Sequence, residues 1–168
     1  MAVANGITHA VLTPHVYAGR WDNRLSNLGG VFSEYKNALA AARIPLQVYL
    51  GGEVHLLPDA FNLMDARDLP YLGVWRGYKV ILLELPDSHI PVGVLKAVDM
   101  FVRAGYLPMI AHPERNKEVM RNVKRLQPLL KAGWWWLPMR TIWCIARQSW
   151  PRRGLRLMKC TVRRLARC

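Results

Sequence analysis

The segment Lys79 to Pro86, KVILLELP, decides the fold class of this 168-residue chain. After the lysine it is a continuous apolar run that ends at a carboxylate, and parallel sheets bury such runs on both faces. Parallel strands must be joined by crossover connections, which are usually helices. The segment therefore predicts a buried strand of an α/β domain.

Strand-like and helix-like segments alternate on both sides of this run. We expect strands at 7–13, 46–50, 79–83 and 106–111, where apolar residues alternate or run together. We expect helices at 31–43, 91–104 and 119–132, with a short helix between the second and third strands. This alternation predicts a parallel sheet or a barrel.

An imidazole or a carboxylate lies at or just after the end of each expected strand. The four residues are, in strand order, His15, Glu53, Glu84 and His112. Sites in barrels and open α/β sheets form at the carboxyl ends of the strands, so these side chains are expected to converge. Mixed histidine and carboxylate ligands suit zinc, manganese or iron.

Each of these residues also has a simpler structural explanation. A lone histidine after a strand is more often a loop residue, and Glu84 could belong to a structural ion pair. Burying an unpaired carboxylate in an apolar run is, however, expensive. The fourfold coincidence favours a metal site, at which two or more ions activate water and clamp a phosphate.

The segment Ile110 to Asn116, IAHPERN, places a candidate ligand, a proline, an acid and an arginine within seven positions. Arg115 is suited to phosphate oxygens because a guanidinium offers a planar, bidentate fork. A salt bridge with Glu114 or Glu118 is the alternative role for this arginine.

Four motifs resemble, in order and spacing, those of bacterial metal-dependent tyrosine phosphatases from capsule and exopolysaccharide operons, within the polymerase-and-histidinol-phosphatase (PHP) superfamily. They are Thr13-Pro14-His15, Gly52-Glu53, Leu83-Glu84-Leu85-Pro86 and Ala111 to Asn116, and the similarity runs from residue 2 to residue 133. The resemblance implies a distorted (β/α) barrel that holds two or three divalent ions, usually manganese.

By that resemblance the reaction is hydrolysis of phosphotyrosine on a partner protein, a bacterial tyrosine kinase. The implied metal ligands are His15, Glu53, Glu84 and His112. Arg115 is implied as the catalytic residue that binds the phosphate. No cysteine nucleophile is needed for such a reaction, because clustered cations supply charge neutralisation and an activated water.

Two parts of that family's site have no counterpart in this sequence. Family members begin with a strand that carries a His-x-His pair, whereas Met1 to Gly6 resembles the end of their first helix. His9, His55 and His89 lack the spacing of that pair, and we expect them to be structural or solvated. No Asp follows Asp99, so the family's C-terminal Ser-Asp-Ala-His motif is absent too. We therefore expect an incomplete barrel with incomplete metal binding and impaired or lost activity.

The C-terminal segment has a different composition from the rest of the chain. Residues 134–168 hold nine of the 24 basic residues, none of the 11 acids, all three Cys and five of the seven Trp. Reading the codons of residues 136–150 from each third base permits Ala-Ser-Asp-Ala-His-Asp-Leu-Val-His-Arg-Pro-Pro, which resembles the missing motif. We expect a partial PHP-type α/β barrel at 1–133 and an irregular, out-of-frame, poorly ordered tail at 134–168, without a disulfide or zinc site.

Two other functions remain open from the sequence. The basic tail could bind polyanions or a membrane surface, given the net charge of +13. A small phosphomonoester such as histidinol phosphate could be the substrate instead of phosphotyrosine. The tail has no known nucleic-acid motif, so we expect no specific nucleic-acid partner. No apolar run reaches about 18 residues, and residues 1–14 lack a leader pattern, so we expect a cytoplasmic protein without membrane insertion.

Overall fold

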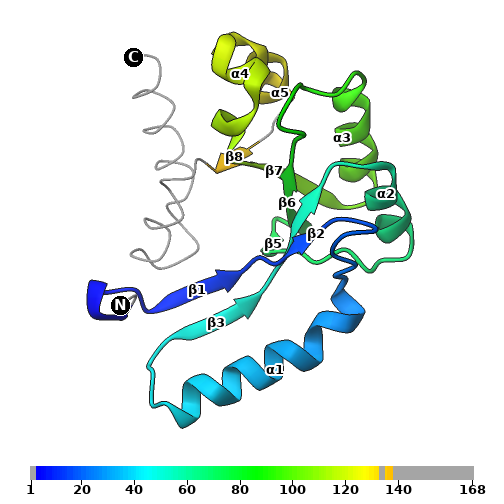
Figure 1. Ribbon diagram of the computed structural model, residues 1–168. Coiled ribbons are helices and arrows are strands. Elements are labelled where there is room, and N and C mark those ends of the chain that lie inside the picture. Colours follow the sequence, from blue (N-terminus) through cyan, green and yellow to red (C-terminus); the bar gives the residue numbers. More distant parts are fainter. Residues whose placement is uncertain (1–2, 133–134, 138–168) are drawn as a thin grey trace.

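The computed structural model describes residues 3–132 and 135–137 (Figure 1). Its strands are β1 (His9–Leu12), β2 (His15–Val16), β3 (Gln47–Leu50), β4 (Glu53–His55), β5 (Gly73–Trp75), β6 (Tyr78–Glu84), β7 (Tyr106–Ala111) and β8 (Trp135–Leu137). Its helices are α1 (Leu25–Ala41), α2 (Pro58–Asp65), α3 (Val94–Arg103), α4 (Lys117–Arg121) and α5 (Gln127–Lys131). Short 3-10 turns form η1 (Val3–Asn5), η2 (Pro113–Arg115) and η3 (Val123–Leu126).

The strands form a larger and a smaller sheet. The larger sheet has the parallel order β2-β4-β6-β7-β8, with β5 added antiparallel to β6, and the smaller sheet pairs β1 with β3 in parallel. The predicted α/β class with parallel strands is therefore confirmed. Within residues 3–132 and 135–137, these strands do not close into a barrel.

The two sheets meet at residues 12–15 and 50–53, where the chain bends out of the smaller sheet and enters the larger one. Pro14 has no N–H for the ladder, but its carbonyl accepts a hydrogen bond of 2.9 Å from the Glu53 amide. A Cβ on Gly52 would lie 2.8 Å from the Pro70 side chain, so only glycine permits this approach. The bend sets His15 beside Glu53 in the register of β2 and β4.

The predicted strand at 79–83 lies at the centre of the core. Ile81 and Leu83 are fully buried on one face of β6, where Phe101 of α3 also packs. Val80 and Leu82 are buried on the other face, together with Met109 of β7. Burial on both faces is the reason that this strand has a continuous apolar sequence.

The structure corrects several predicted elements. The helix expected at 119–132 is wrong, because this segment forms α4, η3 and α5. Asn122 is extended at φ −153° and its side chain accepts a hydrogen bond from the Lys124 amide, which ends one helix and begins the next turn. The expected helix at 31–43 begins at Leu25, and the hairpin of β5 with β6 was not predicted.

The expected boundary at Gly133 lies just before β8. This strand pairs with β7 through Ile110 and Trp136, so the sheet continues past that point. Apart from β8, the predictions for the tail at 134–168 (its irregularity, its frame shift and its cysteines) lie outside the described residues. No helix in the described part of the chain has the length and apolarity needed to span a membrane.

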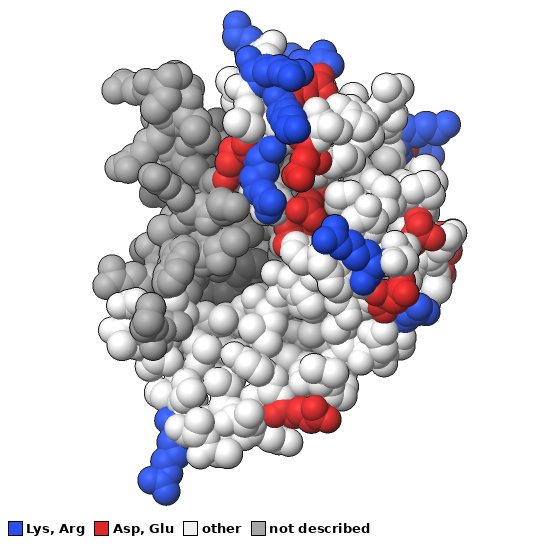
Figure 2. Space-filling view, viewed as in Figure 1, with Lys and Arg blue, Asp and Glu red and all other residues white. Residues whose placement is uncertain are grey.

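Charged side chains are unevenly distributed over the surface. On the face shown in Figure 2, basic and acidic side chains lie side by side over the upper part of the molecule, and few occur over β1, β3 and α1. These three elements also carry exposed apolar side chains, including Val11, Val31, Tyr35 and Tyr49. The described face therefore has mixed charge rather than a single basic patch.

Candidate metal centre

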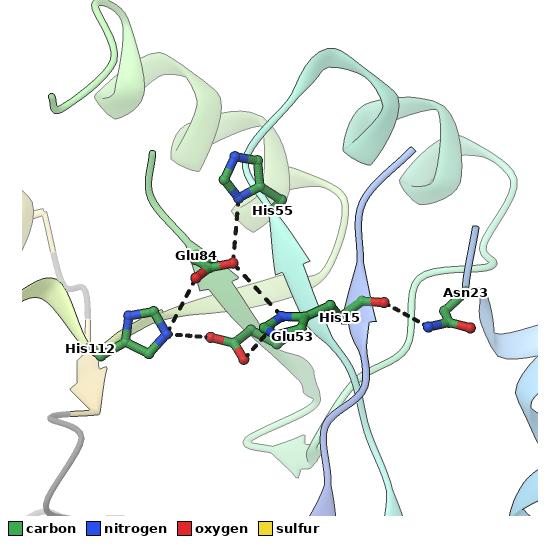
Figure 3. Close-up of polar contacts among 6 residues, drawn as sticks. All are labelled: His15, Asn23, Glu53, His55, Glu84 and His112. Carbon is green, nitrogen blue, oxygen red and sulfur yellow. Dashed lines mark hydrogen bonds and ion pairs between the residues drawn. The ribbon is translucent and has the colours of Figure 1, made fainter. Parts of the chain in front are cut away.

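The structure brings together the four candidate ligands predicted from the sequence. They come from β2, β4, β6 and the residue after β7, which are consecutive neighbours in the larger sheet. Glu84 is the last residue of β6 and His112 follows β7, as expected, but His15 and Glu53 are the first residues of β2 and β4. The four side chains nevertheless lie close together (Figure 3).

Glu53 lies at the middle of this His/Glu cluster. Its carboxylate is 2.6 Å from His112 Nε2 and 3.5 Å from His15 Nδ1. Glu84 is 3.5 Å from the same His112 nitrogen and 3.9 Å from His15 Nδ1. The His15 side chain is 46% exposed, whereas those of Glu53, Glu84 and His112 are 11–15% exposed, so the cluster opens toward solvent on the His15 side.

The donor atoms suit a divalent ion. One ligand atom each from His15, Glu53 and Glu84 lies within 4.8 Å of the other two. His112 borders the same two carboxylates from the opposite side and extends the donor set. Two carboxylates held this close repel each other unless a cation lies between them. Mixed imidazole and carboxylate ligands fit manganese, zinc or iron.

Charges within the cluster are coupled. Burial raises the pKa of Glu53, but the hydrogen bond from His112 and the charges of His112, His15 and Arg115 outweigh it and hold the pKa below its usual 4.5. The hydrogen bond to Glu53 raises the pKa of His112 above its usual 6.5, against the opposing effect of burial. Without a metal, this pair is therefore stabilised as an imidazolium–carboxylate pair.

The loop after β7 holds His112 in an unusual backbone conformation. His112 has φ +25°, a value that L-residues rarely adopt. Three residues later Arg115 ends η2, is exposed to solvent, and acts on both Glu53 and His112 through its charge. One alternative partner for Arg115 is occupied, because Glu118 accepts a hydrogen bond from Arg125.

His55 also contacts the cluster, although it was expected from the sequence to be structural or solvated. His55 Nδ1 lies 3.5 Å from Glu84 Oε2, and the imidazole stacks on Tyr17 with ring centroids 4.6 Å apart. Alternate residues of a strand share a face, so the Glu53-Val54-His55 spacing could have suggested that His55 points toward the cluster. His9 stacks instead on Tyr49 in the smaller sheet, and His89 lies next to Ser88 on a loop.

The coupled pair predicts a pH dependence for the metal-free protein. The raised pKa of His112 contributes stability that is complete below 6.5 and is lost as the pH rises through the folded-state value. The lowered pKa of Glu53 contributes stability that is present above 4.5 and is lost as the pH falls through the folded-state value. The contribution of the pair is therefore largest between pH 4.5 and 6.5.

The free energy of unfolding of the wild-type protein is expected to exceed that of His112→Gln by the largest margin between pH 4.5 and 6.5. Urea unfolding in EDTA across the pH range would measure the margin, which should narrow toward alkaline pH as His112 loses its proton. A margin that stays constant as the pH rises would contradict the coupling.

Residues 1–137 match the family described as "Capsular polysaccharide synthesis, CpsB/CapC". The tyrosine-protein phosphatase YwqE of Bacillus subtilis (strain 168) is 31% identical over 132 residues, which are 79% of this chain and 51% of YwqE. The CapC protein of Staphylococcus aureus is 27% identical over 132 residues, with the same two coverages of 79% and 51%.

A solved structure is similar to this chain as well. It comes from work on YwqE of Bacillus subtilis and CpsB of Streptococcus pneumoniae, described as unique metal-dependent tyrosine phosphatases. The TM-score is 0.69 at 30% sequence identity, and the match covers 78% of this chain and 52% of the solved chain. The chain thus spans about half the length of the curated relatives it matches.

Proposed function

This chain belongs to the capsular polysaccharide synthesis family CpsB/CapC, and on that premise we propose that its His/Glu cluster serves metal-dependent hydrolysis of phosphotyrosine on a partner protein. The observation that carries the proposal is the convergence of His15, Glu53 and Glu84, with donor atoms within 4.8 Å of one another. Similar proteins are tyrosine phosphatases, and the solved structure is of a metal-dependent one.

In this proposal the cluster binds the metal, and the arginine that follows it binds the phosphate. The residues that hold the ions are His15, Glu53, Glu84 and His112. When bound, divalent ions neutralise charge on a phosphate ester and lower the pKa of water. In the metal-free protein Glu53 accepts a hydrogen bond from His112 Nε2, and an ion bound at this nitrogen would replace that proton. Arg115 offers two parallel N–H donors to phosphate oxygens.

The finer assignments are also proposals. We propose manganese as the ion, because carboxylate and imidazole donors both suit it and the resemblance to capsule phosphatases favours it. We propose a bacterial tyrosine kinase of capsule or exopolysaccharide synthesis as the partner that carries the phosphotyrosine. Such a kinase consumes ATP, which supports the cytoplasm as the compartment of the reaction.

Phosphate release by the 168-residue chain tests the proposed reaction. We expect manganese-dependent release from a phosphotyrosine peptide, slower than release by YwqE, because this sequence has no His-x-His pair and no Asp after Asp99. The same assay with histidinol phosphate tests the small-molecule alternative. Release that is insensitive to EDTA, or faster from histidinol phosphate, would reject the proposal.

Arg115→Ala separates phosphate binding from metal binding. We expect manganese affinity to stay unchanged, since a guanidinium is not a metal ligand. Binding of a phosphate analogue at saturating manganese should fall about tenfold, as expected for losing a hydrogen bond to a charged group at an exposed position. Calorimetric titration with methylphosphonate measures this loss.

Arg121→Ala is the matched control, because Arg121 is an exposed basic residue in the neighbouring α4. If both variants weaken methylphosphonate binding equally, Arg115 contributes only through general charge and its proposed role is wrong.

A further inference from the structure

A cavity of about 190 Å³ lies beside the His/Glu cluster. Its walls come from β2, the loop that follows β2, the end of β4 and the first turns of α2. The apolar part of the lining includes Val16, Val54, Ala60 and Leu63. The lining also has polar and charged members, which are Asp22, Asn23, Arg24, His55, Asp59 and Asn62. Apolar cavities of about 150 Å³ bind benzene, so by volume the space is sufficient for one phenyl ring.

Two of the residues that line this cavity also contact candidate metal ligands. Trp21 stacks on His15 with ring centroids 5.2 Å apart. His55 Nδ1 lies 3.5 Å from Glu84. Tyr17 connects the two, because its ring lies 4.6 Å from His55 and 6.4 Å from Trp21. The candidate ligands themselves do not line the cavity, but Trp21 and His55 each border both the cavity and one of these ligands.

The loop that carries Trp21 is held in place without a ligand. Tyr17 and Trp21 exchange backbone hydrogen bonds of 3.0 and 2.7 Å, which form a small hairpin. Asn23 donates a hydrogen bond of 2.7 Å to the His15 carbonyl (Figure 3), and Asn27 donates one of 2.8 Å to the Asp22 carbonyl. A wall ordered in advance loses little conformational entropy when a ring binds.

Trp21 is 40% exposed although it is large and apolar. Its ring is already positioned by His15 and by the Arg20 guanidinium, which lies 4.3 Å from the ring centroid. An aromatic ligand in the cavity would bury the part of the indole that borders it. Burial of an aromatic side chain contributes favourable free energy that an alkyl phosphate of similar charge does not gain.

We infer that this cavity is the subsite for the aromatic ring of phosphotyrosine, with the phosphate at the His/Glu cluster. The inference rests on the proposed function and adds to it a physical basis for preferring aryl over alkyl phosphomonoesters. Trp21 is the specificity-determining residue of this subsite, because it borders both the cavity and His15.

Two non-hydrolysable probes test the subsite on the 168-residue chain at saturating manganese. Phenylphosphonate carries the ring, methylphosphonate does not, and both present the same anion to the cluster. Calorimetric titration should give phenylphosphonate an affinity at least about tenfold higher, as expected for burial of one aromatic ring.

Ala18→Phe should remove that preference, because Ala18 lines the cavity from an exposed loop position and a phenyl group there would fill the space. Methylphosphonate affinity should stay as in wild type. Ala41→Phe, in the last turn of α1, adds the same group away from the cavity and should leave both affinities unchanged. Trp21→Ala should lose the preference for phenylphosphonate, and Trp21→Tyr should retain it.

The outcomes separate this inference from the proposed function. Equal affinity of both probes in wild type, or an unchanged preference in Ala18→Phe, overturns the aryl subsite and leaves manganese-dependent anion binding standing. If neither probe binds in the presence of manganese, both the proposed function and the aryl subsite are wrong.

Discussion

Glu53→Gln is expected to weaken manganese binding by more than about 100-fold. Glu53 is the carboxylate that borders both His15 and His112, and its side chain is 11% exposed. Replacing only residues that contact ligands costs about 10–100-fold in metal affinity, so removing a central ligand charge should cost more. Isothermal titration with manganese at neutral pH measures the loss.

Glutamine is chosen because it has the shape of glutamate and can still accept a hydrogen bond from His112. The metal-free fold should therefore survive, which circular dichroism in EDTA would verify. Glu34→Gln is the control, because it removes the same charge from an exposed position on α1. Wild-type manganese affinity in Glu53→Gln would show that the cluster is an ion-pair network rather than a metal site.

The positions of Glu84 and His112 could be predicted because the sequence marks where their strands end. Glu84 closes an apolar run that is buried on both faces, and His112 follows a strand predicted with its observed limits, Tyr106–Ala111. Parallel pairing of β6 with β7 then places these two residues next to each other. His15 and Glu53 were also expected at strand ends, but they are the first residues of β2 and β4, because the chain passes from the smaller sheet into the larger one just before each of them.

His55 could not be assigned in the same way because its role depends on pairing register. In the structure His55 is the partner of Glu84 across β4 and β6, which brings the two side chains together. A single sequence carries the alternation that puts Glu53 and His55 on one face, but it does not state which residue of the next strand lies opposite. Its contact with Tyr17 depends in addition on the hairpin after β2.

The error at 119–132 has a different physical origin. Val119, Leu126 and Leu129 are all buried. The apolar spacing that predicted one helix therefore identified the buried residues correctly, although the segment is not one helix. Asn122 nevertheless leaves the helical conformation and caps the following turn. Polar side chains that bond to nearby backbone compete with helix propagation, and spacing of apolar residues does not record that competition.

Asn116→Ala is expected to lower the free energy of unfolding by about 3 kcal/mol, as the sum of a lost cap and of buried carbonyls without donors. Asn116 is 2% exposed and bonds in two directions. Its Nδ2 donates to the carbonyls of Pro86 and His89 at 2.6 and 2.8 Å. Its Oδ1 accepts hydrogen bonds of 3.0 and 3.1 Å from two amides at the start of α4.

These bonds join the loop that follows Glu84 to the loop that follows His112. Asn116→Ala should therefore also weaken manganese binding, because two of the candidate ligands lose a shared support. Asn122→Ala is a matched control: Asn122 also caps a helical turn, through the Lys124 amide, but is exposed. Loss of that cap alone should cost about 1 kcal/mol and leave manganese affinity unchanged.

Asn116→Asp separates the two halves of the interaction. Aspartate retains the acceptor that caps α4, and it places a second acceptor against the carbonyls of Pro86 and His89. We expect it to be no more stable than Asn116→Ala in urea unfolding at neutral pH, although aspartate is a good cap. If Asn116→Asp instead recovers wild-type stability, the cap explains the whole effect and Asn116 does not bridge the two ligand-bearing loops.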